Sequence, residues 1–197
     1  MKRSWLGLAV LALVLATLAC GKPPQAEMDA AKAAMDDAQA SAEKWASSEW
    51  QAAQSSMSQA QAEVEAQNQK WFKNYDKAKD MLAQAKADAE KAKAAAATNK
   101  ETAKNEATAA IADATAAMES AKTALASAPK GKDTKADLAL FQQDLDGMAT
   151  TLAEAQTAMQ SEDYTTAKDK ANSVKEKATS ISDQIAQASA KKAGVRK

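Results

Sequence analysis

Cys20 is the residue best suited to covalent chemistry, because it is the only cysteine among 197 residues. A thiolate is a strong nucleophile and accepts acyl or alkyl groups. The chain contains no histidine, which excludes a Ser-His or Cys-His catalytic pair and the usual zinc sites. Carboxylates are plentiful, but no Asp-rich loop has the glycine turn that calcium sites need. We therefore expect no enzyme activity, no catalytic residue, no metal site and no cofactor.

The segment before Cys20 has the pattern of an export signal. A short basic start precedes an uncharged apolar run over residues 5–16, which is too short and too near the amino terminus for a transmembrane helix. The run ends in Thr17-Leu18-Ala19-Cys20, which resembles the lipobox of bacterial lipoproteins. That resemblance implies cleavage before Cys20 and acylation of its thiol. The alternative is an ordinary signal peptide in which the cysteine stands by chance.

The residue after the cysteine bears on the membrane. One acyl chain holds a protein only weakly, so stable attachment takes more than one, and lipoproteins of this kind carry two or three. In their sorting an Asp after the cysteine favours the inner membrane, whereas this chain has Gly21. The resemblance therefore implies a lipid anchor in the outer membrane of a diderm bacterium, with the mature part in the periplasm.

The charge balance argues against some partners. Leaving Lys2 and Arg3 out of the 26 basic residues gives 24, against 26 acidic residues, so the mature part has a net charge of −2. A nearly neutral chain has no general attraction to nucleic acid. We expect a protein partner in the cell envelope and no nucleic acid. The oligomeric state stays open.

The composition predicts helices. Between residues 25 and 128 there is no glycine or proline, and alanine, the best helix former, is abundant. We predict an all-α fold of long antiparallel helical hairpins forming an elongated coiled-coil-like bundle. The predicted organisation is a lipoprotein signal peptide (1–19), a tether (20–27), a long helical hairpin (28–128), a turn (129–132), a second helical hairpin (133–190) and a basic tail (191–197).

Apolar residues recur at alternating steps of three and four, as in a coiled-coil seam. A first seam runs over residues 28–71 with a one-residue slip between Trp45 and Trp50. The seams over residues 75–92 and 107–125 are out of phase, so the helix either restarts near residue 99 or runs straight and presents a second face. Two more seams are separated by a break at residues 160–163, where Asp163 can cap the following helix. The first comprises Leu138, Phe141, Leu145, Met148, Leu152, Ala155 and Met159. The second comprises Tyr164, Ala167, Ala171, Val174, Ala178, Ile181, Ile185 and Ala188.

An internal repeat links the two predicted hairpins. Tyr75-x-x-Ala78-Lys79-Asp80 matches Tyr164-x-x-Ala167-Lys168-Asp169 at an offset of 89 positions, and Glu65-Ala66-Gln67 matches Glu154-Ala155-Gln156 at the same offset. We predict a duplicated hairpin in which each tyrosine begins the second helix and packs against the first. Gly147 lies beside a seam, where a close helix approach would explain it.

These motifs and the end of the chain carry three further resemblances. Tyr-x-x-Ala-Lys after a polar turn is similar to the hairpins of tetratricopeptide-like proteins. With the lipobox, the chain resembles an uncharacterised family of alanine-rich helical lipoproteins of Gram-negative bacteria, which implies a fold and a compartment but no activity. The terminal Arg196-Lys197 also resembles the end of murein lipoproteins, which implies a peptidoglycan link through Lys197. Against it, an even number of hairpin helices returns the chain end toward the membrane.

Three aromatic residues are candidates for a partner contact. Trp71, Phe72 and Tyr75 can form a cluster at a hairpin tip, where a partner reaches them. For Trp45, Trp50 and Trp71 we expect seam packing, to which a stacking or glycan-binding platform is the alternative. The tip cluster is a further alternative for Trp71. We expect core filling for the methionines Met28, Met35, Met57, Met81, Met118, Met148 and Met159. The two functions that remain are a structural spacer or protein-interaction scaffold, and a binding module for lipid, peptide or glycan in a groove between hairpins.

Overall fold

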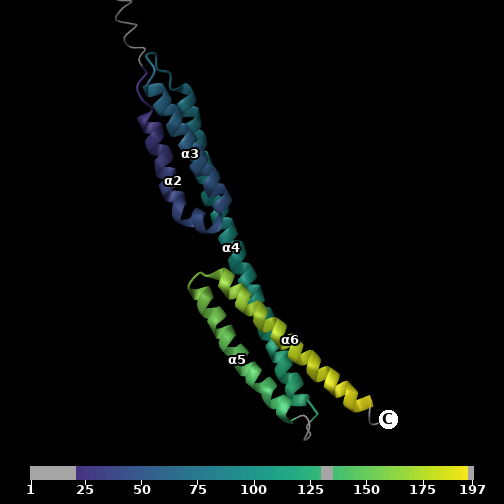
Figure 1. Ribbon diagram of the computed structural model, residues 1–197. Coiled ribbons are helices and arrows are strands. Elements are labelled where there is room, and N and C mark those ends of the chain that lie inside the picture. The colour runs from purple at the N-terminus through teal and green to yellow at the C-terminus, as the bar shows by residue number, and fades with distance from the viewer. Residues whose placement is uncertain (1–20, 130–134, 195–197) are drawn as a thin grey trace, which may run out of the picture. The chain divides into compact units, whose positions relative to one another are not determined.

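The computed structural model describes residues 21–129 and 135–194, and every element within these ranges is an α-helix (Figure 1). The predicted all-α class is confirmed, and the helices pack against one another as a bundle. Cys20 and Lys197, two of the predicted sites, lie outside these ranges. The helices are α2 (Gln25–Trp45), α3 (Ser47–Asn68), α4 (Asp76–Ser127), α5 (Lys135–Gln160) and α6 (Tyr164–Gly194).

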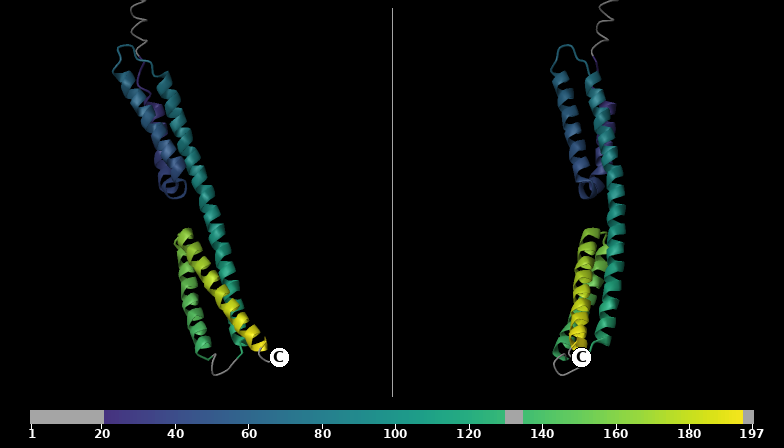
Figure 2. Two further views of the ribbon diagram at one scale, coloured as in Figure 1. Left: turned by 45° about the vertical axis from the view of Figure 1, so that its right-hand side comes forward. Right: turned by 90° about the vertical axis from the view of Figure 1, so that its right-hand side faces the viewer.

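The chain divides into two compact units between Lys100 and Glu101, inside α4. Unit 1 contains α2, α3 and the first part of α4, and unit 2 contains the rest of α4 with α5 and α6. Each unit is thus a bundle of three helical segments in which consecutive helices run antiparallel (Figure 2). The expected long hairpin over residues 28–128 is wrong, because that stretch contains three helices, whereas the predicted second hairpin corresponds to the two helices α5 and α6.

The unexpected reversal lies at Ala46. This residue has φ −147° and ψ 52°, outside the helical region, and it separates α2 from α3. The backbone oxygen of Trp45 accepts a hydrogen bond of 2.7 Å from Nδ2 of Asn99 in α4. This bond satisfies one of the carbonyl groups that have no partner within the helix at the C-terminal end of α2. The one-residue slip in the first seam, over residues 28–71, therefore marks a turn between two helices and not a slip within one helix.

Unit 1 has a core made largely of alanine. Small residues let the helices approach closely, and a few larger side chains fill the remaining space. Trp50 is 6 % exposed, and Leu82 is fully buried. The buried residues, in two clusters, are Ala31, Met57, Ala60, Val64, Tyr75, Ala78, Leu82 and Ala85, then Ala38, Ala42, Ala46, Trp50, Ala53, Ala89, Ala92 and Ala96.

Unit 2 has a core richer in branched side chains. The predicted seams of α5 and α6 meet there, with Leu138 and Phe141 partly buried at its edge. Ala188, predicted at the end of the α6 seam, is exposed instead. The buried cluster comprises Ala110, Ala114, Met118, Ala121, Ala128, Leu145, Met148, Leu152, Ala171, Val174, Ala178, Ile181 and Ile185.

The structure tests two predictions that concern the interior of helices, namely the possible restart of α4 near residue 99 and the close approach at Gly147. α4 is continuous through residues 97–103, so the helix does not restart near residue 99. Its buried positions stop at Ala96 and resume at Ala107. The close approach expected at Gly147 is wrong, because a Cβ placed there would meet nothing within 4 Å.

The repeat is present, but its register differs from the gapless match. Tyr75 and Tyr164 are 3 % and 5 % exposed and stand at the start of α4 and α6, so the predicted equivalence is confirmed at an offset of 89. In the preceding helices the buried Met57, Ala60 and Val64 correspond to the buried Leu145, Met148 and Leu152, an offset of 88. The match of Gln67 with Gln156 is therefore wrong, since Gln67 is buried and Gln156 is exposed.

Candidate functional site: the aromatic tip between α3 and α4

The loop of residues 69–75, which joins α3 to α4, carries an exposed pair of aromatic side chains. Trp71 is 87 % exposed and Phe72 is 86 % exposed. Among the described residues, Leu140 is the only other large apolar side chain that is exposed, and at 58 % it is less so. We call Lys70, Trp71, Phe72 and Lys73 the aromatic tip. Seam packing of Trp71 is wrong, because α3 ends at Asn68 before its seam reaches position 71.

Tyr75 does not share this exposure. Its ring lies in the core of unit 1 at 3 % exposure, and its hydroxyl donates a hydrogen bond of 2.5 Å to Oδ1 of Asn68. Of the three residues predicted to form a partner contact, Trp71 and Phe72 are exposed and Tyr75 is buried. The first two residues present an exposed surface, and the third fastens the loop beneath them.

Buried and partly buried polar groups hold the loop in place. Gln67, 7 % exposed, is the one buried polar side chain in the described part of the core. Its Oε1 accepts from the Asn74 backbone N–H at 3.4 Å, and its Nε2 donates to Oε1 of Glu63 at 2.8 Å. Lys77 Nζ donates to Glu63 Oε2 at 2.7 Å. Such a satisfied network fixes the exit from α3 and the entry to α4.

The electrostatics of Glu63 follow from this network. The hydrogen bond from Lys77, and then that from Gln67, stabilise the carboxylate and hold the pKa of Glu63 below its ordinary value of 4.5. The side chain of Asn74 in turn accepts from the Asp76 N–H at 2.8 Å, which caps the start of α4. The aromatic tip is therefore anchored at both of its ends.

The tip is basic, and the start of the described chain lies against it. No acidic residue occurs from Ala66 to Tyr75, whereas Lys70 and Lys73 flank the two aromatics. Gly21 packs on this loop, since a Cβ built on it would lie 3.3 Å from Tyr75 Cδ2 and 3.4 Å from the Lys73 carbonyl oxygen. In Figure 1 the beginning of the described chain and the α3–α4 loop lie at the same end of unit 1.

The corresponding turn of unit 2 has different chemistry. Residues 161–163 join α5 to α6, and Glu162 has a positive φ of 57°. Asp163 caps α6 as predicted, accepting from the Thr166 N–H at 3.3 Å. This turn carries two acidic residues and no aromatic residue. A hairpin of this repeat therefore closes without aromatics, and the fold does not require Trp71 or Phe72.

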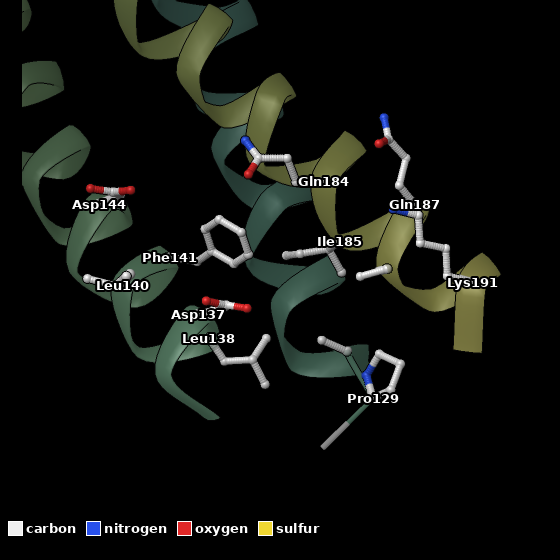
Figure 3. A pocket seen from close by; sticks show the side chains of 12 residues that line it. Pro129, Asp137, Leu138, Leu140, Phe141, Asp144, Gln184, Ile185, Gln187 and Lys191 are labelled. Carbon is white, nitrogen blue, oxygen red and sulfur yellow. The ribbon is translucent and has the colours of Figure 1, made fainter. Parts of the chain in front are cut away.

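A second candidate surface is a groove in unit 2. It has a volume of about 560 Å³. Leu138 and Phe141 of α5 and Ile185 of α6 point into it (Figure 3). No methionine or tryptophan lines this groove. Its lining is Ala128, Pro129, Asp137, Leu138, Leu140, Phe141, Asp144, Gln184, Ile185, Gln187, Ala188 and Lys191.

The remaining predicted residues belong to the cores. Trp50 is buried, and Trp45 is partly buried against the same cluster, so their structural role is confirmed. Met57, Met118 and Met148 are buried, as core filling predicts, and Met28, Met35, Met81 and Met159 are partly buried. In the described ranges no helix is long and apolar enough to cross a membrane, and no cluster of acidic or cysteine side chains is arranged to hold a metal ion.

The missed features have recognisable causes. Trp71 follows Val64 by one heptad, so the periodicity assigned it to the seam although the helix ends earlier. Gln67 stands out in the sequence only as part of the repeat, because the residues around a buried glutamine follow the same pattern as those around an exposed one. Comparison of the chain with protein-family models, curated proteins and solved structures finds no match.

Proposed function

We propose that the protein is a non-enzymatic lipoprotein, anchored through acylated Cys20 in the outer membrane, that serves as a spacer or protein-interaction scaffold in the periplasm. The observation that carries this proposal is the repeated three-helix unit, in which each unit buries its own apolar core. Repeated helical units of this kind offer extended surfaces to partners.

The outer faces of the helices support the same reading. Lys93 pairs with Asp37 at 2.6 Å and Lys175 pairs with Asp113 at 2.8 Å, in each case between different helical segments of one unit. The paired side chains are half exposed, so each pair adds little stability. Pairs of opposite charge leave a mixed surface without a strong field, which suits a scaffold better than a nucleic-acid binder.

Cell fractionation with in-cell crosslinking tests the proposal. We expect the wild-type chain in the outer membrane and the Cys20→Ser variant released from it. A photo-crosslinking residue at the exposed Gln61 or Gln142 should give discrete protein adducts, and the same residue at buried Ala85 should give none. A chain found in the cytoplasm, or one that forms no adduct from any exposed position, contradicts the proposal.

A covalent link of Lys197 to peptidoglycan is a further part of this proposal, carried only by the resemblance to murein lipoproteins. Purified peptidoglycan is boiled in detergent and digested with a muramidase. A peptide ending in Lys197 that carries a murein fragment would establish the link. If no such peptide is found, the lipid is the sole covalent anchor.

The groove of unit 2 favours a second candidate function, a binding module for a lipid, peptide or glycan. Leu138, Phe141 and Ile185 offer an apolar floor, and Asp137 and Lys191 add charge at the rim, a combination common in ligand sites. A fluorescent fatty acid should bind the wild-type chain and bind Phe141→Ala more weakly. Gln61→Ala, at an exposed position of α3 in unit 1, is the control and should bind as the wild type does. Equal binding by both variants excludes this site.

A further inference from the structure

We infer that the aromatic tip is a second membrane contact, in which Trp71 and Phe72 enter the interface of the bilayer that holds the lipid on Cys20. The inference rests on the proposed anchoring and goes beyond it. It assigns a role to two side chains that the fold does not use, and it fixes which end of unit 1 meets the lipid.

The first argument is the chemistry of the exposed pair. Trp71 and Phe72 are adjacent in the chain and expose 87 % and 86 % of their surface. Tryptophan is enriched at membrane–water interfaces, because its ring is apolar and its N–H needs a polar partner. The loop beneath them is held by Gln67, Asn74 and Tyr75, so the pair is presented without a large cost of ordering the loop.

The second argument is position. Gly21 packs against the Lys73 carbonyl and the Tyr75 ring, and it directly follows Cys20 in the sequence. Consecutive Cα atoms lie about 3.8 Å apart. The residue that would carry the acyl chains is therefore the sequence neighbour of a residue held on the loop, so a bilayer entered by these chains would meet the aromatic tip at high effective concentration.

The third argument is charge. Lys22, Lys70 and Lys73 are the charged residues nearest in sequence to the anchor and the two aromatics, and the first acidic residue after the pair is Asp76 at the start of α4. Basic residues beside an anchor are attracted to anionic headgroups, and salt screens that attraction. The equivalent turn of unit 2, with Glu162 and Asp163, has the opposite charge and no aromatic pair.

Depth-dependent fluorescence quenching tests the inference. The mature chain is coupled through its single thiol to a maleimide lipid in vesicles of phosphatidylethanolamine and phosphatidylglycerol, some containing lipids brominated near the headgroup. The Trp71 signal is the wild-type emission minus that of Trp71→Phe. We expect this signal to be quenched and shifted to shorter wavelength. A matched control, Gln51→Trp in the Trp71→Phe background, places an exposed tryptophan near the other end of α3 and should not be quenched.

The outcomes separate the inference from the anchoring. On vesicles that carry the coupled protein, the Trp71 signal could be quenched by aqueous iodide and not by brominated lipid. That result overturns the inference and leaves the anchoring intact. It would also favour a protein as the occupant of the tip. An unmodified Cys20 in cells would overturn the anchoring without altering the vesicle result, because the coupling supplies the lipid. Unchanged helicity of Trp71→Phe by circular dichroism establishes that the difference spectrum reports position and not unfolding.

Discussion

The hydroxyl of Tyr75 donates a hydrogen bond of 2.5 Å to Oδ1 of Asn68, which ties the start of α4 to the end of α3 across the aromatic tip. Tyr75→Phe keeps the buried ring and removes only this donor. We expect it to lower the free energy of unfolding by about 1 kcal/mol, measured by urea denaturation. Combined with Asn68→Ala, the loss should be smaller than the sum of the two single losses, because the pair is one interaction. Strictly additive losses would show that the bond contributes nothing.

Gly147 offers a stabilising substitution. A Cβ there meets nothing within 4 Å, and alanine is more favourable than glycine inside a helix by about 1 kcal/mol. Gly147→Ala should therefore raise the thermal midpoint. Gly21→Ala is the matched control, since its Cβ would press on the Tyr75 ring at 3.3 Å, and it should give no increase. An unchanged or lower midpoint for Gly147→Ala would mean that α5 needs the glycine.

Leu145 and Leu140 form a matched pair on α5. Leu145 is 1 % exposed and Leu140 is 58 % exposed. Leu145→Ala should cost roughly 2–5 kcal/mol through lost burial and the cavity left behind, whereas Leu140→Ala should change stability by less than about 0.5 kcal/mol. Chemical denaturation followed by circular dichroism measures both. Similar losses at the two positions would contradict the seam of α5.

The acid stability of unit 1 should depend on Glu63. Its pKa in the folded chain lies below 4.5 because Lys77 and Gln67 donate to the carboxylate. A lowered folded pKa contributes stability above the unfolded pKa, and this contribution is lost as the pH falls through the folded pKa. Tryptophan emission reports on unit 1, where Trp45, Trp50 and Trp71 lie. Glu63→Gln should weaken the loss of stability below pH 4.5, and Lys77→Met should weaken it too. An acid transition identical to that of the wild type in both variants would exclude this role.

The periodicity of large residues predicted much of the fold. Leu145, Val174 and Ile181 stand at seam positions in the sequence and are buried in the structure, because a branched side chain at a seam has no favourable alternative to burial. Ala46 was missed, since alanine favours helix wherever it stands. Its turn depends on a contact with Asn99 in a distant helix, which local pattern does not contain.

The candidate site was predicted in part. The sequence offered a hairpin tip for Trp71 and Phe72, against seam packing for Trp71, and both side chains are exposed in the α3–α4 loop. The sequence also placed Tyr75 in this cluster, but its side chain is buried in the core of unit 1. The proximity of Gly21 to this loop could not be predicted from sequence, because it depends on α2 packing along α4.

Mass spectrometry of the mature amino terminus, isolated from the native host, tests the central claim most directly. The account predicts that the first residue is Cys20 and that it carries acyl chains on its thiol. A free thiol at Cys20, or a mature chain that starts at another residue, would contradict the lipid anchor and the outer-membrane location together.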